Sequence, residues 1–392
     1  MIKLLTVIGA RPQIIKAAAI SRAVRGHFAD RIEERILHTG QHYDANMSQV
    51  FFDELGIPHP DYNLNVGSGK HAEQTAKMMA GIEEVLLSEH FDGIILYGDT
   101  NSTLAGAVAA SKLHVPVYHI EAGLRSFNMS MPEEINRIVC DRLSTVLFAP
   151  TETAVENLKR EGFTDSKACF ADGRGHAVVN VGDVMYDNSM YFATLADAKS
   201  DILQRYDLTP DKYILATIHR DNNTDIPERL TAVFTALLEI ARSKPQYKIV
   251  LPLHPRTAKL IPQNLDAKIH EDFKACPNIV CIPPASFFEI IVLEKNSAIV
   301  LTDSGGVQKE AYFYRKPCVI MRPETEWVEI VKAGAGIVAD ADTQRIVEAA
   351  DCLLSRSIAY PKVFGDAAAA QRILAFILNS VGKKKKFLFN DI

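Results

Sequence analysis

A dense mixture of unlike charges fills residues 121–142, directly after the apolar run PVYHI. The segment EAGLRSFNMSMPEEINRIVCDR carries Glu121 and Glu133, and Asp99 follows an earlier apolar run, GIILYG. Carboxylates that share one cleft acquire separated pKa values, which is how acid and base roles arise. The pattern therefore indicates proton-transfer chemistry, although Asp99 taken alone is better explained as a helix N-cap.

Pro132 in MPEEINRIVCDR marks the start of a helix, so Glu133 and Arg137 are expected one turn apart on one face. Glu134 points about 100° away and is expected to be solvated or to interact with the helix dipole. The competing interpretation is an ordinary helix salt bridge worth about 0.3–0.5 kcal/mol.

The stretch VLTDSGGVQKEA has the composition of an anion site. A buried strand ends in Thr302 and Asp303, and Ser304 with two glycines, Gly305 and Gly306, opens a helix. A hydroxyl, close backbone approach and free N–H groups at one spot suit a phosphate. The competing interpretation is a plain serine N-cap.

Other candidate ligand groups also follow predicted strands. Glu310, six residues after Ser304 on the same helix, could accept hydrogen bonds from a sugar diol. Arg11 and Lys16 in IGARPQIIK surround the first strand-to-helix junction, where they could hold phosphate or carboxylate or be two ordinary surface cations. TIHRDNN and LPLHPRT each deliver a histidine–arginine pair, the first of which is His219 with Arg220.

Bulk composition indicates two globular domains. The 392 residues are 47% hydrophobic, and single cores rarely grow beyond about 250–300 residues. The net charge of −5 comes without a long basic stripe, which argues against nucleic acid as a partner. Six scattered cysteines form no C-x-x-C pair, so no zinc site and a cytoplasmic location are expected, and no segment is long and apolar enough to insert in a membrane.

Short apolar runs alternate with amphipathic helical stretches, which predicts α/β domains with doubly wound parallel sheets. The rhythm weakens after residue 164 and resumes at YILATIH. We expect one Rossmann-like domain over 1–180, a second over 181–365, and a helix with a tail over 366–392 that packs back on the first. Ligands of such sheets bind beyond the carboxyl ends of the strands, so two facing domains would leave a cleft between them.

These motifs, taken in order, resemble the non-hydrolysing UDP-N-acetylglucosamine 2-epimerases. The resemblance rests on GARPQIIKAAAI, YGDTNSTLAGAVAA, HIEAGLR, PEEINR, FAPTETAVENLKREG, HR after a strand, and LTDSGGVQKEA, which span nearly the whole chain. It implies a GT-B-like fold with a nucleotide sugar in the interdomain cleft, no metal or other cofactor, and a homodimer.

The resemblance also implies roles for individual residues. The positions that match catalytic residues of the family are Lys16, Asp99, Glu121, Glu133, Arg137 and His219. The positions that match UDP-binding residues are Arg11, His219, Ser304, Gly305, Gly306 and Glu310.

The chain departs from the family pattern at a few positions. Gln13 stands where many members have glutamate, and Asn222 also stands where glutamate is usual. Asp44 replaces a glutamine of members that a second substrate molecule activates, which argues against that allosteric site. GARPQ, LRSFNM and ETEWVE are similar to the subgroup acting on UDP-2,3-diacetamido-2,3-dideoxy-glucuronate for surface polysaccharide synthesis, and Arg125 or Arg220 could bind the sugar carboxylate.

Epimerisation at C2 of a 2-acetamido sugar has no adjacent carbonyl to acidify the C–H bond. Elimination of UDP to a 2-acetamidoglucal, followed by re-addition, offers a route that needs carboxylates for the proton and cations for the departing diphosphate. Alternatives that stay open are UDP-N-acetylglucosamine as the substrate, a hydrolysing 2-epimerase, a GT-B glycosyltransferase and a binding protein without activity.

Overall fold

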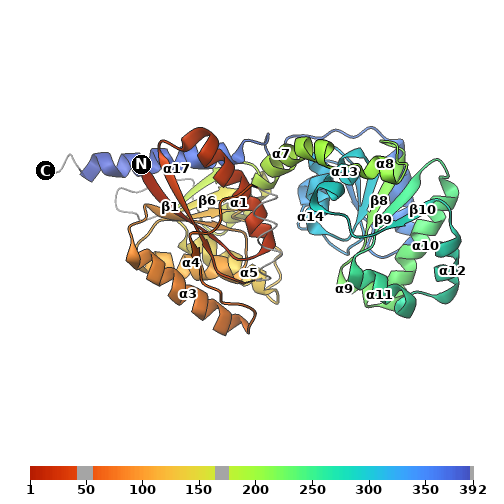
Figure 1. Ribbon diagram of the computed structural model, residues 1–392, viewed down its shortest axis with the longest axis horizontal. Coiled ribbons are helices and arrows are strands. Elements are labelled where there is room, and N and C mark those ends of the chain that lie inside the picture. The colour runs from red at the N-terminus through yellow and green to blue at the C-terminus, as the bar shows by residue number, and fades with distance from the viewer. Residues whose placement is uncertain (42–55, 164–175, 389–392) are drawn as a thin grey trace. The chain divides into compact units, whose positions relative to one another are not determined.

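The computed structural model describes residues 1–41, 56–163 and 176–388, and divides the chain into two compact units (Figure 1). Unit 1 comprises residues 1–188 and 362–392, and unit 2 comprises residues 189–361. Asp44, from which the absence of an allosteric site was expected, lies outside the described residues. Within the described residues, no helix is long and apolar enough to cross a membrane.

Unit 1 contains a parallel sheet in the order β3-β2-β1-β4-β5-β6-β7. Its strands are β1 (Ile2–Ile8), β2 (Ile32–His38), β3 (Tyr62–Asn63), β4 (Gly93–Tyr97), β5 (Val117–Ile120), β6 (Val146–Ala149) and β7 (Ala177–Asn180). Its helical segments are α1 (Arg11–Ala23), the π-turn η1 (Val24–Phe28), α3 (His71–Ser88), α4 (Asn101–Lys112), α5 (Pro132–Leu143), α6 (Glu152–Arg160) and α17 (Ala369–Leu388), while α7 (Val184–Lys199) crosses the boundary into unit 2.

Unit 2 contains a second parallel sheet, in the order β10-β9-β8-β11-β12-β13. Its strands are β8 (Tyr213–Thr217), β9 (Lys248–Pro252), β10 (Ile279–Ile282), β11 (Ile299–Thr302), β12 (Cys318–Ile320) and β13 (Gly336–Val338). Its helices are α8 (Ile202–Arg205), α9 (Asp221–Thr224), α10 (Pro227–Ser243), α11 (Pro255–Asn264), α12 (Ala267–Ala275), α13 (Phe287–Asn296), α14 (Gly305–Phe313), α15 (Val328–Lys332) and α16 (Thr343–Ser355).

Continuous apolar strands account for both sheets. Every residue of β4, β5, β8 and β11 is buried, as expected when helices cover both faces of a parallel sheet. All strand pairs in the described residues are parallel, including β1 with β4 and β8 with β11. The prediction of two doubly wound parallel α/β domains is confirmed.

The last helix belongs to unit 1. In Figure 1 the blue helix α17 lies beside the red helix α1, and the two are in contact. The carboxylate of Asp187 accepts hydrogen bonds from the backbone N–H groups of Ala369 and Ala370, at 3.1 and 2.9 Å. The first turn of α17 is thereby capped by a side chain from α7.

Candidate active site

Three parallel strands bring charged side chains to one edge of the unit 1 sheet. β1, β4 and β5 are neighbours, so their carboxyl ends lie together. Lys16 is on α1, which follows β1, and Asp99 and Glu121 follow β4 and β5. Residues far apart in the sequence are therefore gathered where ligands of such sheets bind.

Lys16 and Glu121 form an ion pair, and their side chains are only 12% and 9% exposed. Glu121 has a φ of 71°, a left-handed conformation that is uncommon for a residue with a side chain. Gly98 lies beside the pair: a Cβ there would come within 3.2 Å of the Lys16 Nζ and 3.3 Å of the Glu121 Oε2. The backbone is thus bent so that this pair and Gly98 can pack closely.

Asp99 does not cap the helix that follows it. The N-cap of α4 is Thr100, whose hydroxyl oxygen accepts the backbone N–H of Thr103 at 3.4 Å. The Asp99 carboxylate instead accepts a hydrogen bond from Arg137 at 2.5 Å. The capping interpretation of Asp99 is therefore wrong, because its carboxylate is held by a cation from α5.

Arg137 does not use Glu133 as its partner in the structure. Besides Asp99, its guanidinium contacts Glu134 at 2.8 Å, whereas Glu133 is exposed. The expectation of a solvated Glu134 is wrong: it is 1% exposed and accepts the backbone N–H groups of Ser126 and Phe127. Burial alone would raise the pKa of Glu134, but these N–H groups and Arg137 hold it below its ordinary value.

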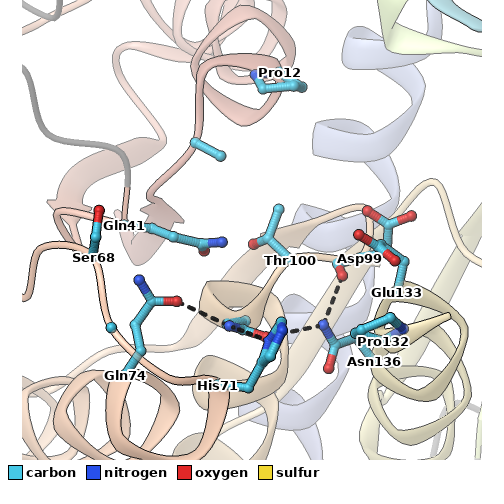
Figure 2. Close-up of a pocket in the computed structure, with 13 residues that line it drawn as sticks. Pro12, Gln41, Ser68, His71, Gln74, Asp99, Thr100, Pro132, Glu133 and Asn136 are labelled. Carbon is cyan, nitrogen blue, oxygen red and sulfur yellow. Dashed lines mark hydrogen bonds between the residues drawn. The ribbon is translucent and has the colours of Figure 1, made fainter. Parts of the chain in front are cut away.

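A pocket of about 410 Å³ opens next to these carboxylates, and all of its lining residues belong to unit 1. Asp99 and Glu133 lie on the same side of it (Figure 2). Gln41 and His71 line it as well, and Pro12 comes from the first turn of α1. The pocket is large enough for a polar ring such as a sugar.

Amide side chains fix the wall of this pocket between α3, α4 and α5. The Asn101 amide donates to the Gln74 carbonyl oxygen at 2.9 Å and to the His71 Nδ1 at 3.2 Å. The Asn136 amide donates to the backbone oxygen of Asp99 at 2.9 Å, as the dashed lines in Figure 2 show. The position of Asp99 is thus held at its backbone by Asn136 and at its side chain by Arg137.

The predicted anion site of unit 2 lies at the start of α14. Ser304 is its N-cap residue, but its side chain makes no capping hydrogen bond, which leaves the hydroxyl available to a ligand. A Cβ on Gly305 would lie 2.3 Å from the Glu326 Oε1, at the mobile end of a flexible side chain that can shift away. A Cβ on Gly306 would meet only the Ser304 Oγ, at 3.9 Å, so the approach is open. The free N–H groups of this helix start can bind an anion.

His219 follows the neighbouring strand β8 and is held by Asp303. The buried Asp303 carboxylate accepts the backbone N–H groups of His219 and Arg220 at 3.1 Å, and lies 3.2 Å from the His219 Nδ1. Loss of hydration lowers the pKa of His219 despite Asp303, with the nearby Arg220 charge acting in the same direction. Asp303 therefore places a histidine beside the α14 N-terminus, since β8 and β11 are adjacent.

The remaining predicted ligand groups fall in different places. Glu310 is partly buried on α14, and loss of hydration raises its pKa above the ordinary value. Arg11 is the first residue of α1 and belongs to unit 1, whereas His219, Ser304 and Glu310 belong to unit 2.

The structure corrects one prediction about an arginine. The side chain of Arg125 is 1% exposed and pairs with Asp141 and Glu161, so it cannot bind a sugar carboxylate. In the second histidine–arginine pair, a guanidinium nitrogen of Arg256 lies 2.5 Å from a carboxylate oxygen of Asp225 in an exposed ion pair.

Sequence reasoning missed several buried polar side chains that hold the site. Gln13, noted only as a departure, is 1% exposed; it accepts the N–H groups of Gly9 and Ala10 and donates to the backbone oxygen of Tyr97 at 3.0 Å. It thereby ties the loop after β1 to the end of β4. A signal was present for His119: it is a polar residue inside the apolar run PVYHI.

The fold and site define a protein of the GT-B-like class, with an acid cluster in one α/β unit and an anion site in the other. The fold alone is shared with a glycosyltransferase from Rickettsia africae, at 13% identity and a TM-score of 0.55. The model of the family described as UDP-N-acetylglucosamine 2-epimerase matches residues 26–378. The chain belongs to this family.

Individual relatives match over almost the full length. The UDP-2,3-diacetamido-2,3-dideoxy-D-glucuronate 2-epimerase of Pseudomonas aeruginosa is 48% identical, covering 96% of this chain and 99% of its own. A UDP-N-acetylglucosamine 2-epimerase homolog of Methanococcus maripaludis is 46% identical with the same coverage. The UDP-GlcNAc 2-epimerase of Methanocaldococcus jannaschii, solved with UDP-GlcNAc and UDP, has a TM-score of 0.78 at 39% identity, covering 96% of this chain and 99% of its own.

Proposed function

We propose that the chain is a non-hydrolysing UDP-sugar 2-epimerase that converts UDP-2,3-diacetamido-2,3-dideoxy-glucuronate into its mannuronate epimer. The observation that carries the proposal is the gathering of Asp99, Glu121 and Glu133 with two cations at one sheet edge, beside a pocket of sugar size. The substrate follows the Pseudomonas aeruginosa relative, which is 48% identical.

The reaction is an elimination followed by an addition. A carboxylate takes the proton from C2, the C1–O bond breaks with its electron pair passing to UDP, and a C1–C2 double bond forms. A carboxylic acid then returns a proton to C2 on the opposite face, and the UDP oxygen adds back to C1. Carboxylates on both faces of the sugar meet this need, and Asp99, Glu121 and Glu133 are the candidates.

The cations of unit 1 orient these carboxylates. Lys16 holds Glu121, and Arg137 holds Asp99 while it is itself held by the buried Glu134. Among the described residues Glu133 forms no ion pair, and it lines the pocket directly. Fixed donors and acceptors lower the barrier because they need no reorganisation during the reaction.

Unit 2 supplies the site for the leaving group. The free N–H groups at the start of α14, the Ser304 hydroxyl and His219 stabilise the diphosphate. The proposed role of Arg11 in UDP binding follows from the family resemblance alone. Glu310, further along α14, accepts hydrogen bonds from the ribose hydroxyls.

The carboxylate of the glucuronate substrate needs a cation of its own. Arg125 is excluded because its charge is used by Asp141 and Glu161. Arg220, which follows His219 and is exposed, remains the candidate from the sequence. Replacing Arg220 with methionine should raise the KM for the glucuronate substrate more than the KM for UDP-N-acetylglucosamine.

The cellular context is proposed from the family as well. We place the enzyme in the cytoplasm, as a homodimer that supplies a UDP-sugar for surface polysaccharide such as lipopolysaccharide O-antigen. Size-exclusion chromatography with light scattering tests the dimer, for which the expected mass is twice the 43.4 kDa of one chain.

The deciding experiment is NMR of the protein with UDP-2,3-diacetamido-2,3-dideoxy-glucuronate, and separately with UDP-N-acetylglucosamine, in deuterated water without an acceptor. Deuterium at C2 of a UDP-linked manno product is expected, and the preferred substrate identifies the subgroup. Free UDP with a released sugar would mean hydrolysis, and no turnover of either compound would favour a glycosyltransferase or a binding protein.

A matched variant locates the chemistry in the acid cluster. Glu121→Gln keeps the size of the side chain but removes its charge, and is expected to lower kcat by about 10²–10⁴-fold. Glu152→Gln, an exposed glutamate at the start of α6, is the control. Full turnover by Glu121→Gln would remove Glu121 from the mechanism.

A further inference from the structure

His119 lies inside β5 with no exposed surface, and both of its ring nitrogens face hydrogen-bond acceptors. Nδ1 lies 2.7 Å from the Asp141 Oδ1, and Nε2 lies 2.8 Å from the backbone oxygen of Gly98. A backbone carbonyl can only accept, so Nε2 carries a hydrogen. The state of Nδ1 then depends on whether Asp141 is ionised.

The surroundings of Asp141 favour its ionised form. Its Oδ2 contacts the Arg125 guanidinium at 2.7 Å and accepts the Gly123 N–H at 3.2 Å. Asp141 is fully buried, yet His119 and Arg125 outweigh the loss of hydration and hold its pKa below the ordinary value. An ionised carboxylate accepts only, so Nδ1 must donate as well.

Charge balance leads to the same result. The charged or titratable groups around the ring come from three segments: Cys140 and Asp141 on α5, Arg125 in the loop after β5, and Glu161 at the end of α6. With a neutral ring, Arg125 would face two carboxylates, whereas a cationic ring gives two positive and two negative charges. Buried charges are tolerated when they are paired in this way.

The pKa of His119 agrees with this assignment. Burial alone would lower it, but Cys140 and Asp141 outweigh that effect and raise the pKa well above its ordinary value.

The network holds the backbone on both sides of the acid cluster. His119 binds the oxygen of Gly98, the residue before Asp99, and Asp141 binds the N–H of Gly123, two residues after Glu121. Glu121 has a positive φ angle of 71°, which is costly for a residue with a side chain, so its turn needs tertiary support. Gly98, at 60°, adopts the same region freely because it has no side chain.

We propose that His119 is a permanently protonated positioning residue, which clamps the turns carrying Asp99 and Glu121. The proposal rests on the proposed function in so far as those carboxylates act on substrate. It assigns His119 no contact with substrate and no proton transfer, because the ring is buried and both of its hydrogens are used.

Protonation is tested directly on the wild-type protein. Long-range ¹H–¹⁵N NMR of histidine side chains should show both His119 nitrogens protonated from pH 6 to pH 9, assigned by loss of the signals in His119→Asn. A neutral tautomer at pH 8, or titration near pH 6.5, would overturn the proposal. This readout does not require activity, so it is independent of the proposed function.

The clamp is tested with His119→Asn against His90→Asn, which replaces a histidine whose side chain is 85% exposed. Amide hydrogen exchange should accelerate at residues 98–99 and 121–123 in His119→Asn only, and kcat should fall on the order of 10²-fold with KM changed less than about threefold. Unchanged exchange or full kcat in a folded His119→Asn would refute the clamp. If the wild-type protein shows no epimerase activity but amide exchange is still faster in His119→Asn, the proposed function is refuted and the clamp is not.

Discussion

Units 1 and 2 both bury acidic side chains near the residues expected to act on substrate. The pKa of the buried acid is lowered in unit 1 and raised in unit 2. In unit 1, Asp141 is fully buried between His119 and Arg125, and its pKa is lowered. In unit 2, Glu294 on α13 is 1% exposed, and neither carboxyl oxygen has a hydrogen-bond partner among the described residues. Loss of hydration, with the nearby Glu310 charge, raises the pKa of Glu294 well above its ordinary value.

The difference shows what burial alone does to a carboxyl group and what partners change. Removing water favours the neutral form, and only nearby cations and N–H donors reverse that preference. Asp141 is therefore a carboxylate stabilised by a cation and N–H donors, whereas Glu294 is a buried carboxyl without hydrogen-bond partners among the described residues, for which the neutral form is favoured. The predictions below test this contrast.

Removing the carboxylate of Asp141 should have the largest effect on stability. Asp141→Asn leaves Arg125 and His119 buried without their shared counter-charge, and should lower the free energy of unfolding by about 3–5 kcal/mol. Urea denaturation followed by circular dichroism measures the change. The control is Asp272→Asn on the surface of unit 2, where Asp272 pairs with Arg242; an equal effect of the two variants would contradict the contrast.

Replacing Glu294 should act in the opposite direction. Glu294→Leu removes a buried polar group without partners among the described residues, and should raise the free energy of unfolding by about 1–3 kcal/mol. Glu294→Gln keeps an unsatisfied polar group and should gain less at pH 5. A lower free energy of unfolding for Glu294→Leu would contradict the prediction, because it would mean that the Glu294 carboxyl stabilises the folded protein.

The two carboxyls should also give stability profiles of opposite sign. The folded pKa of Glu294 lies above 4.5, so the wild type loses stability as pH rises from about 4.5 through that pKa, and Glu294→Gln abolishes this loss. The folded pKa of Asp141 lies below 3.8, so its contribution is present above that value and is lost as pH falls through the folded pKa. Urea midpoints from pH 3 to pH 8 measure both; equal slopes in wild type and Glu294→Gln would exclude a raised pKa.

The smallest effect is expected at an exposed ion pair. At the surface of unit 2, a guanidinium nitrogen of Arg256 lies 2.5 Å from a carboxylate oxygen of Asp225, and the two side chains are 42% and 47% exposed. Asp225→Ala should cost at most about 1 kcal/mol, because water screens the charges and the side chains lose entropy on pairing. The cost should shrink further in 0.5 M NaCl, while the effect of Asp141→Asn should change little.

Local patterns predicted the fold because a strand buried on both faces consists of consecutive apolar residues. Runs such as GIILY and IVLT, separated by helical stretches, indicated strands that are buried on both faces of a parallel sheet. They also predicted the strand ends, and so placed Asp99 and Glu121 on one edge.

Pairing between side chains could not be read in the same way. Helix spacing suggested Glu133 as the neighbour of Arg137, but Arg137 turns to Asp99 and to Glu134, which the packing of α5 buries. The sequence predicted that Arg125 could bind a sugar carboxylate, but in the structure it pairs with Asp141 and Glu161.

The sequence by itself determined the class of fold, the strand ends at which charged residues gather, and a resemblance that the family model bears out. Only the tertiary structure decided which charges are paired, which are buried, and that both nitrogens of His119 face acceptors. The physical reason is range: strand and helix patterns arise from neighbouring residues, whereas desolvation and ion pairing depend on groups that approach from distant parts of the chain.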